Sequence, residues 1–279
     1  MTVITLRHFR FWPGAVDRCP NSIARDTMAT GTGRETHMAE TLTAALESTF
    51  EEARNLYGTL GEKLRFVAER MEELSPTYCQ QVDDFIHRLE QAKAGVSAPQ
   101  VGEPMPDFIL PDDQGRLVSL QQMLEVAPVV ITFLRGHWCP YCRLNAIGLS
   151  GIEEAIAPVQ IVAISAETQV HTRAMKTESG GNFPFLTDIG NGYALSLNLA
   201  IWVDDAMASL IAGLGLDIPK FQNQDGWIMP IPSVFVVAQN GLITARHVDP
   251  DYRRRLEIED LRMAAEAVMA TPSAFPVAN

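Results

Sequence analysis

Apolar residues recur every three or four positions over the stretch 42–74. They are Leu42, Leu46, Phe50, Ala53, Tyr57, Leu60, Leu64, Val67, Met71 and Leu74. A period near 3.5 residues predicts an amphipathic helix with one apolar seam, long enough for coiled-coil pairing. Gly58 and Gly61 weaken this helix, and Ser75-Pro76 should end or kink it, because the residue before a proline avoids helical backbone. A second helix follows, with Tyr78, Val82, Phe85 or Ile86, and Leu89 directed inward.

The helical segment has two interpretations. Its seam either packs as a helical hairpin against the chain's own domain or pairs with a second copy of the chain. For the second case we predict a homodimer that forms through the 42–74 seam.

Short apolar runs alternate with helical patterns after a linker rich in glycine and proline at residues 94–106. Strands are predicted at 107–110, 128–134, 159–165 and 183–186, and helices at 139–156, 168–178, 192–197 and 206–213. Residues 232–238 and 242–248 should form a hairpin over Gln239-Asn240-Gly241, because Asn-Gly supplies the positive φ of a tight turn. A helix over 255–271 closes the pattern. Such alternation predicts an α/β fold with a mixed central sheet.

These patterns divide the chain into four parts. Residues 1–37 hold five arginines against three acids and little periodicity, so we predict a disordered tail. A helical extension follows at 38–96, the α/β domain at 97–271 and a short C-terminal tail at 272–279.

The composition excludes several classes of protein. The chain has 279 residues, 47% hydrophobic and 20% charged, with a formal net charge of −12. These proportions exclude wholesale disorder, collagen-like repeats and a small disulfide-dense scaffold. Because nucleic-acid binding needs a basic face, the acidic balance also argues against a nucleic-acid partner.

The lengths of the hydrophobic runs indicate whether the chain could cross a membrane or carry a secretory signal. None reaches the roughly 18 residues that a membrane span needs, so we expect no membrane association. The first residues lack an apolar stretch followed by a small-residue cleavage site, which argues against a secretory signal. The cytoplasm is therefore the expected compartment.

Two of the four cysteines form the motif Cys139-Pro140-Tyr141-Cys142 between a predicted strand and a predicted helix. This placement puts Cys139 at a helix N-terminus, where free N–H groups and the helix dipole favour a thiolate. Cys142 lies one helical turn further, within disulfide reach. The motif therefore predicts a redox-active disulfide in which Cys139 attacks and Cys142 resolves the product.

Neighbouring residues add to this picture. Arg135 and His137 would stabilise a thiolate if they point toward it, and Glu167 is a candidate proton-handling group at the end of a strand. A zinc site would need two more ligands, whereas Cys19 and Cys79 stand alone and are expected to be incidental. We therefore expect neither a metal nor an organic cofactor. An inert structural disulfide is the other alternative.

Three sequence blocks resemble a known family. Pro106-Asp107-Phe108-Ile109-Leu110-Pro111-Asp112, followed by Gly115 and Val118-Ser119-Leu120, resembles the entry signature of the AhpC/TSA peroxiredoxin family. The block from Arg135 to Cys142 and the ending Val248-Asp249-Pro250-Asp251-Tyr252-x-x-Arg255 are similar to a peroxiredoxin-like branch that carries Cys-x-x-Cys. The resemblance implies a thioredoxin-like fold over about residues 101–270. It also implies that Ile231-Pro232-Ser233 is the cis-proline turn opposite the cysteines, with Pro232 part of the catalytic site.

The sequence departs from the family pattern in two places. Thr132 and Gly136 stand where peroxiredoxins usually have a proline and a threonine or serine, seven and three residues before the attacking cysteine. The hydroxyl that would hold the peroxide is therefore absent, and Arg135 is the expected substitute donor. No arginine matches the family's activating arginine securely, and Arg246 is the candidate for that role.

The resemblance implies a thiol-dependent peroxidase that reduces a hydroperoxide through a Cys139 sulfenic acid. Cys142 would resolve it to a disulfide, and a dithiol donor such as thioredoxin would restore both thiols. A thioredoxin-like disulfide reductase or isomerase is the alternative, which the missing threonine favours. A third hypothesis is a non-catalytic redox sensor whose helical extension binds a partner.

Overall fold

The computed structural model describes residues 32–269. The predicted tails lie outside this range, apart from residues 32–37, which belong to the first helix instead of a disordered segment. None of the helices in the described range is both long and apolar enough to cross a membrane.

A five-stranded mixed sheet forms the centre of the molecule, with the strand order β5-β4-β3-β8-β9. Its strands are β3 (Val129–Phe133), β4 (Gln160–Ser165), β5 (Phe185–Thr187), β8 (Ser233–Val237) and β9 (Ile243–Val248). Strands β3, β4 and β5 run parallel, and β8 and β9 form the predicted antiparallel hairpin. All five residues of β3 are buried, which explains its unbroken run of apolar and β-branched residues.

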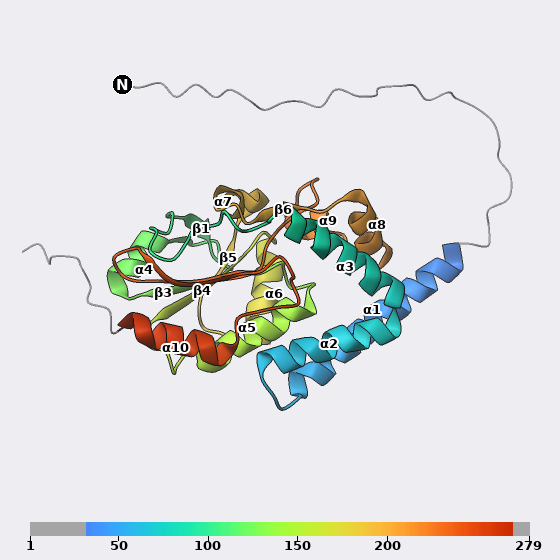
Figure 1. Ribbon diagram of the computed structural model, residues 1–279, viewed down its shortest axis with the longest axis horizontal. Coiled ribbons are helices and arrows are strands. Elements are labelled where there is room, and N and C mark those ends of the chain that lie inside the picture. The colour runs from blue at the N-terminus through green and yellow to red at the C-terminus, as the bar shows by residue number, and fades with distance from the viewer. Residues whose placement is uncertain (1–31, 270–279) are drawn as a thin grey trace, which may run out of the picture.

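Alternate residues of the strands enter two separate hydrophobic cores, because side chains along a strand point to opposite faces. Val130 lies in one core and Ile131 in the other. Helices α5 (Pro140–Ile152), α6 (Gln169–Ser179) and α10 (Ile258–Met269) cover the first face, and α4 (Leu120–Val126) and α7 (Gly192–Ser196) cover the second (Figure 1). This is a thioredoxin-like fold, as expected.

The predicted strand at 107–110 corresponds to β1 (Ile109–Pro111), which pairs with β2 (Leu117–Ser119), a strand that was not predicted. The pair of β6 (Ala200–Trp202) and β7 (Ile228–Pro230) was not predicted either. Between β6 and β7 the chain inserts α8 (Asp205–Gly213), which matches the predicted helix at 206–213, and the unpredicted helix α9 (Ile218–Gln222). A 3-10 turn, η1, spans Ile189–Asn191. The end of α8 lines the same cavity as Cys139.

The helical extension consists of three helices: α1 (Thr32–Asn55), α2 (Leu60–Leu74) and α3 (Pro76–Gln91). Helix α1 ends shortly before Gly58, and α2 begins with a capping box in which the side chains of Thr59 and Glu62 each accept a backbone N–H of the other residue. The break before Pro76 occurs where it was predicted. One long seam is thus folded into a hairpin, and a third helix follows it.

Within that hairpin the seam packs against the chain itself. Phe50, Leu64, Val67 and Met71 are each at most 4% exposed and share a hydrophobic core with residues of α5. Packing against the chain's own domain is thereby confirmed for these side chains. Homodimerisation through the seam stays a prediction, and it would have to use surfaces other than these four buried side chains.

Candidate active site

The Cys-x-x-Cys motif lies between the end of the central strand β3 and the start of helix α5. Strand β3 ends at Phe133, and α5 begins at Pro140, with Cys139 as the residue before its first turn. Pro140 fits this position because its missing N–H would have no helical partner. The site therefore stands at the carboxyl end of β3, the edge at which sites in open α/β sheets are usually found.

The two sulfurs have different surroundings. Both cysteines are buried, Cys139 at 1% and Cys142 at 0% exposure, and both are free thiols. Cys139 lines a cavity, whereas Cys142 lies behind it against the backbone. The Arg135 N–H donates to the Cys142 sulfur over 3.2 Å, and the Arg255 Nη2 lies 3.7 Å from the same atom.

These contacts shift the pKa of the two thiols in opposite directions. Burial raises the pKa of both thiols, and at Cys139 it prevails, together with the hydrogen bond to Cys142. At Cys142 the burial is outweighed by that same hydrogen bond and by the positive charges of Arg255 and Arg135, so its pKa falls to about 5. These contacts favour a thiolate on Cys142 over one on Cys139, and a resting Cys139 thiolate stays a prediction. The donors that stabilise a thiolate converge on the second sulfur.

A pH titration of the reduced protein should reveal this shared proton. We expect thiolate absorbance near 240 nm to rise with a midpoint at about pH 5, and Cys142→Ser should remove that rise. The folded pKa lies below that of an unfolded thiol, about 8.5. The linked stabilisation is therefore complete above pH 8.5 and lost as the pH falls through 5. A midpoint near 8.5 in the folded protein would contradict the assignment.

Arg135 is a buried cation held between aromatic rings. It is 5% exposed, and its guanidinium carbon lies 3.8 Å from the ring centre of Tyr252 and 4.8 Å from that of Trp138. Its Nε donates to the Met229 sulfur at 3.1 Å. Among residues 43–269 it has no ion pair with a carboxylate, so the charges nearest to it include the cysteine pair. Such a cation stabilises a thiolate or another anion beside it.

Gly136 and Glu167 fit closely together behind the cysteines. Glu167 is fully buried, and its Oε2 accepts the His137 N–H over 2.7 Å. Burial raises its pKa to about 8, so it is protonated at neutral pH. Gly136 has φ +145°, and a Cβ added there would lie 2.5 Å from the Glu167 Cδ. The close approach explains why this position cannot carry the family's threonine.

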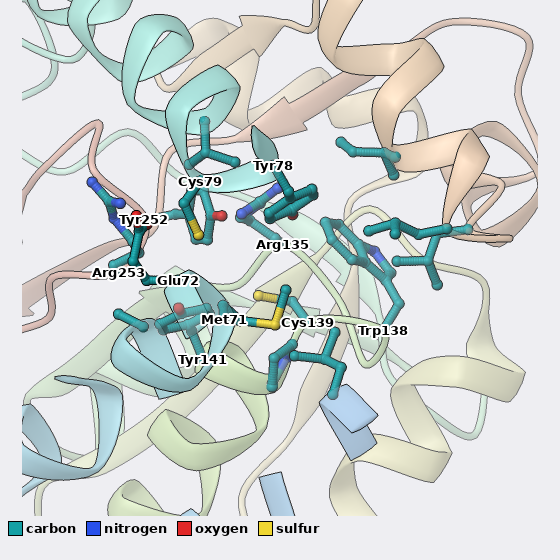
Figure 2. Close-up of a pocket in the computed structure, with 17 residues that line it drawn as sticks. Met71, Glu72, Tyr78, Cys79, Arg135, Trp138, Cys139, Tyr141, Tyr252 and Arg253 are labelled. Carbon is teal, nitrogen blue, oxygen red and sulfur yellow. The ribbon is translucent and has the colours of Figure 1, made fainter. Parts of the chain in front are cut away.

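The cavity in front of Cys139 encloses about 670 Å³, part of it open to solvent. Its walls come from separate parts of the chain, as Figure 2 shows: Met71 and Glu72 of α2, Tyr78 and Cys79 of α3, Tyr141 of α5, and Tyr252 and Arg253 of the segment before α10. The Cys79 thiol, which sequence alone placed only in a helix, belongs to this wall. Burial and a hydrogen bond to Glu72 raise its pKa to about 11.

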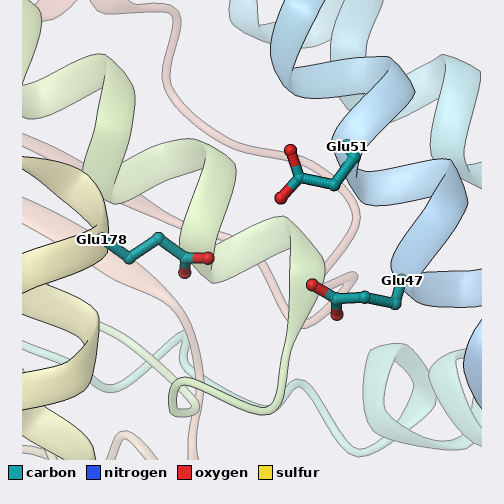
Figure 3. Close-up of side chains that lie close together, drawn as sticks. All are labelled: Glu47, Glu51 and Glu178. Atoms are coloured by element: carbon teal, nitrogen blue, oxygen red, sulfur yellow. The ribbon is translucent and has the colours of Figure 1, made fainter.

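A group of ion pairs fastens α5 to its neighbours. Arg143 donates to Glu47 of α1 over 2.6 and 2.7 Å and to Glu178 of α6 over 2.5 and 2.7 Å. The carboxylates of Glu47, Glu51 and Glu178 lie close together in Figure 3. Because the Arg143 guanidinium donates hydrogen bonds to the carboxylate oxygens of Glu47 and Glu178, we interpret this group as an ion-pair cluster and not as a metal site. The His137 ring also bonds Glu178, at 3.1 Å, and it does not line the cavity in front of Cys139.

Two expectations about more distant residues need correction. The Ile231–Pro232 peptide is trans, and the cis bond of the described chain is Ala157–Pro158. Ile231 donates to Leu199 O as a continuation of the β6–β7 pairing, so the chain passes in extended form into β8 without a tight turn. Pro232 nevertheless lines a small cavity together with Arg135.

The second expectation concerns Arg246, the candidate for the activating arginine, which lies away from the cysteines. Arg246 donates to Gln100 Oε1 and Gly95 O, and it makes no contact with the cysteines. Arg255 is the second guanidinium beside Cys142. In the sequence, Arg255 ends the block Val248–Arg255 that carries part of the family resemblance. Tyr78 was predicted only as an inward-facing residue of the helical extension, and the structure places it in the wall of the cavity.

Comparison with protein families gives a clear assignment. The sequence profile of the AhpC/TSA family matches residues 101–246, more than half of the chain. This chain belongs to the AhpC/TSA family. None of the curated proteins matches it. AhpC/TSA membership supports an oxidoreductase that works through cysteine thiols.

Solved structures similar to this AhpC/TSA chain include peroxidoxin BcpB from Mycobacterium tuberculosis, with 19% identity, a TM-score of 0.48 and coverage of 62% of this chain and 99% of that one. The reduced 2-Cys peroxiredoxin of Plasmodium vivax has 15% identity, a TM-score of 0.46 and coverage of 62% and 98%. A putative thiol:disulfide interchange protein DsbE from Chlorobium tepidum has 20% identity, a TM-score of 0.38 and coverage of 61% and 98%. These similarities are too low to add to the family assignment.

Proposed function

We propose that the chain is a thiol peroxidase in which Cys139 is the attacking residue and Cys142 the resolving one. The observation that carries this proposal is the placement of Cys139 on the wall of a cavity, with Cys142 directly behind it. A hydroperoxide entering the cavity meets the Cys139 sulfur first. Arg135, on the same wall, supplies N–H donors for the peroxide oxygens in place of the absent threonine hydroxyl.

The first step oxidises Cys139. Its proton moves to Cys142 along the hydrogen bond between the two sulfurs, and the resulting thiolate attacks the terminal peroxide oxygen. The O–O bond breaks, the sulfur loses two electrons, and water or an alcohol leaves once the departing oxygen has taken the proton from Cys142. The products are a Cys139 sulfenic acid and a Cys142 thiolate.

The second step closes the disulfide. The Cys142 thiolate attacks the Cys139 sulfur, the S–O bond breaks, and hydroxide leaves and becomes water on protonation. Because Cys142 has a pKa of about 5, it is already ionised for this attack. Glu167, protonated at neutral pH and close enough for the Cys142 charge to raise its pKa further, is the candidate proton source. An external thiol, for which the family resemblance suggests thioredoxin, then returns the disulfide to two thiols.

The disulfide reductase alternative requires a protein disulfide to reach Cys139. Helices α2 and α3 cover that sulfur, and only 1% of Cys139 is exposed. A small hydroperoxide fits this access better than a polypeptide does. The absent threonine favours the reductase, so the two functions have to be compared directly.

The decisive measurement is peroxide consumption compared with insulin reduction, with a thiol in excess. We expect the chain to consume peroxide with saturable turnover while insulin precipitates no faster than with the thiol alone. Rapid insulin reduction together with peroxide consumption at the background rate would overturn the peroxidase and favour the reductase.

A further inference from the structure

The cavity in front of Cys139 is roofed by parts of the chain outside the sheet. Met71 and Tyr78 come from the helical extension, and Ile211 and Leu214 come from the end of the inserted helix α8 (Figure 2 labels the first two). Together with Trp138 they enclose the space through which the sulfur is reached.

Ion pairs and hydrogen bonds fasten this roof at both ends. Arg253 forms an ion pair with Asp83 of α3 over 2.7 Å, and Arg88 of α3 pairs with Asp204 beside α8 over 2.6 Å. At the start of α2, the Gly61 N–H donates to Glu257 over 3.0 Å. A protein reductant must bring its own sulfur within about 2 Å of the sulfur it attacks. The roof stands in the way of such an approach.

Within the cavity, positive charge exceeds negative charge. The guanidinium groups of Arg135 and Arg253 line it, and Glu72 is the acidic residue of its wall. Arg253 is already paired with Asp83 and Asp251. Arg135 has the Met229 sulfur as its hydrogen-bond acceptor, and no carboxylate among residues 43–269 pairs with it. A buried cation without an acidic partner is a favourable place for an anionic ligand.

We propose that the cavity binds a low-molecular-weight thiol bearing a carboxylate, and that such a thiol is the reductant of the Cys139–Cys142 disulfide. The carboxylate pairs with Arg135 while the thiol faces Cys139. This inference rests on the proposed peroxidase, and it replaces thioredoxin with a small thiol as the electron donor.

The reduction consumes two thiols. The first thiolate attacks the Cys139 sulfur, the S–S bond breaks, and Cys142 leaves as a thiolate, a good leaving group because its pKa is low. A second thiolate attacks the sulfur of the bound thiol in this mixed disulfide. Cys139 is released as a thiolate that takes up a proton, and the small thiols depart as their own disulfide. Two electrons pass from the two thiols to the protein.

The test measures reduction alone. The full chain is oxidised with diamide, the Cys139–Cys142 disulfide is verified by mass spectrometry, and its reduction is followed with four reductants. These are 3-mercaptopropionate, 2-mercaptoethanol, cysteamine and reduced thioredoxin, each compared per thiolate. We expect 3-mercaptopropionate to react about tenfold faster than cysteamine, with 2-mercaptoethanol between them, since tenfold corresponds to about 1.4 kcal/mol. Thioredoxin should be slower than 3-mercaptopropionate. Equal rates for the three small thiols, or a faster reaction with thioredoxin, would overturn the proposal.

Variants that change the charge of the cavity wall test the proposed carboxylate site directly. Glu72→Gln removes the acidic residue of the cavity, so the rate with 3-mercaptopropionate should rise about twofold to threefold while that with 2-mercaptoethanol stays the same. Glu69→Gln, an exposed residue of α2 outside the cavity, is the control and should change neither rate. Arg135→Gln should lower the ratio of the two rates about tenfold. An unchanged ratio in Arg135→Gln would refute the proposed carboxylate site.

The two proposals fail in different ways. Because diamide supplies the oxidation, the reductant preference is measured whether or not peroxide oxidises the pair. A chain that prefers carboxylate thiols but ignores peroxide would refute the peroxidase and keep the cavity site. A chain that reacts with peroxide but is reduced fastest by thioredoxin would keep the peroxidase and refute the cavity site for a small thiol.

Discussion

Cys139→Ser should lower the rate of peroxide consumption about a thousandfold, because the variant lacks the sulfur that meets the substrate. Cys142 cannot replace it, since its sulfur is fully buried behind Cys139 and does not line the cavity. The measurement is peroxide loss under steady-state conditions, with the folded state checked by circular dichroism. Wild-type rates in a folded Cys139→Ser variant would remove the catalytic assignment.

Cys142→Ser is the matched control and should behave differently. Without added thiol, wild type and Cys142→Ser should each consume one peroxide per chain. The wild type then holds a disulfide, whereas the variant holds a sulfenic acid that dimedone traps and mass spectrometry detects. The assignment of the two roles is wrong if the trapped sulfenic acid is found on Cys142 in Cys139→Ser and none forms on Cys139 in Cys142→Ser.

Gly136→Ala should lower the free energy of unfolding by about 3 kcal/mol. Backbone at φ +145° is open to glycine and costs other residues roughly 1–3 kcal/mol. The new methyl group would also lie 2.5 Å from the Glu167 Cδ and 2.6 Å from the Trp138 Nε1, so the loop before Cys139 has to shift. Chemical denaturation of the reduced protein measures the loss.

Gly151→Ala is the control for this substitution. Gly151 lies in α5, exposed, and a Cβ there would meet no atom within 4 Å. Alanine in a helix should stabilise the protein by about 1 kcal/mol relative to glycine. If Gly136→Ala costs no more than Gly151→Ala, the loop accommodates a side chain, and the lack of space does not explain the absent threonine.

The sequence predicted the parts of the site that are close together along the chain. A buried strand followed by Cys139 and Pro140 specifies a strand, a short loop and a helix, and these local preferences agree with the fold. The sheet, its hairpin and the helical seam were likewise visible as periodic patterns. Gly136 also stood out as a departure, although its cause, the close approach of Glu167, lies far along the chain, just after the end of β4.

Contacts between distant segments could not be predicted in the same way. Tyr78 reaches the cavity because the hairpin of α1 and α2 brings α3 over the cysteines, which no local pattern encodes. The contacts that lower the pKa of Cys142 have a similar origin. A helix N-terminus favours Cys139, but the Arg135 N–H and Arg255 act on Cys142, and Arg255 is more than one hundred residues away in sequence.

The two guanidinium groups beside the sulfurs also bear on the redox balance of the pair. In the reduced state Arg135 and Arg255 face a negative sulfur, whereas in the disulfide both sulfurs are neutral and the same cations lose their counter-charge. Stabilising the reduced form raises the reduction potential of a dithiol pair. The disulfide is thereby made easy to reduce, so that even a single-sulfur donor, individually a weak reductant, would be able to return the protein to its resting form.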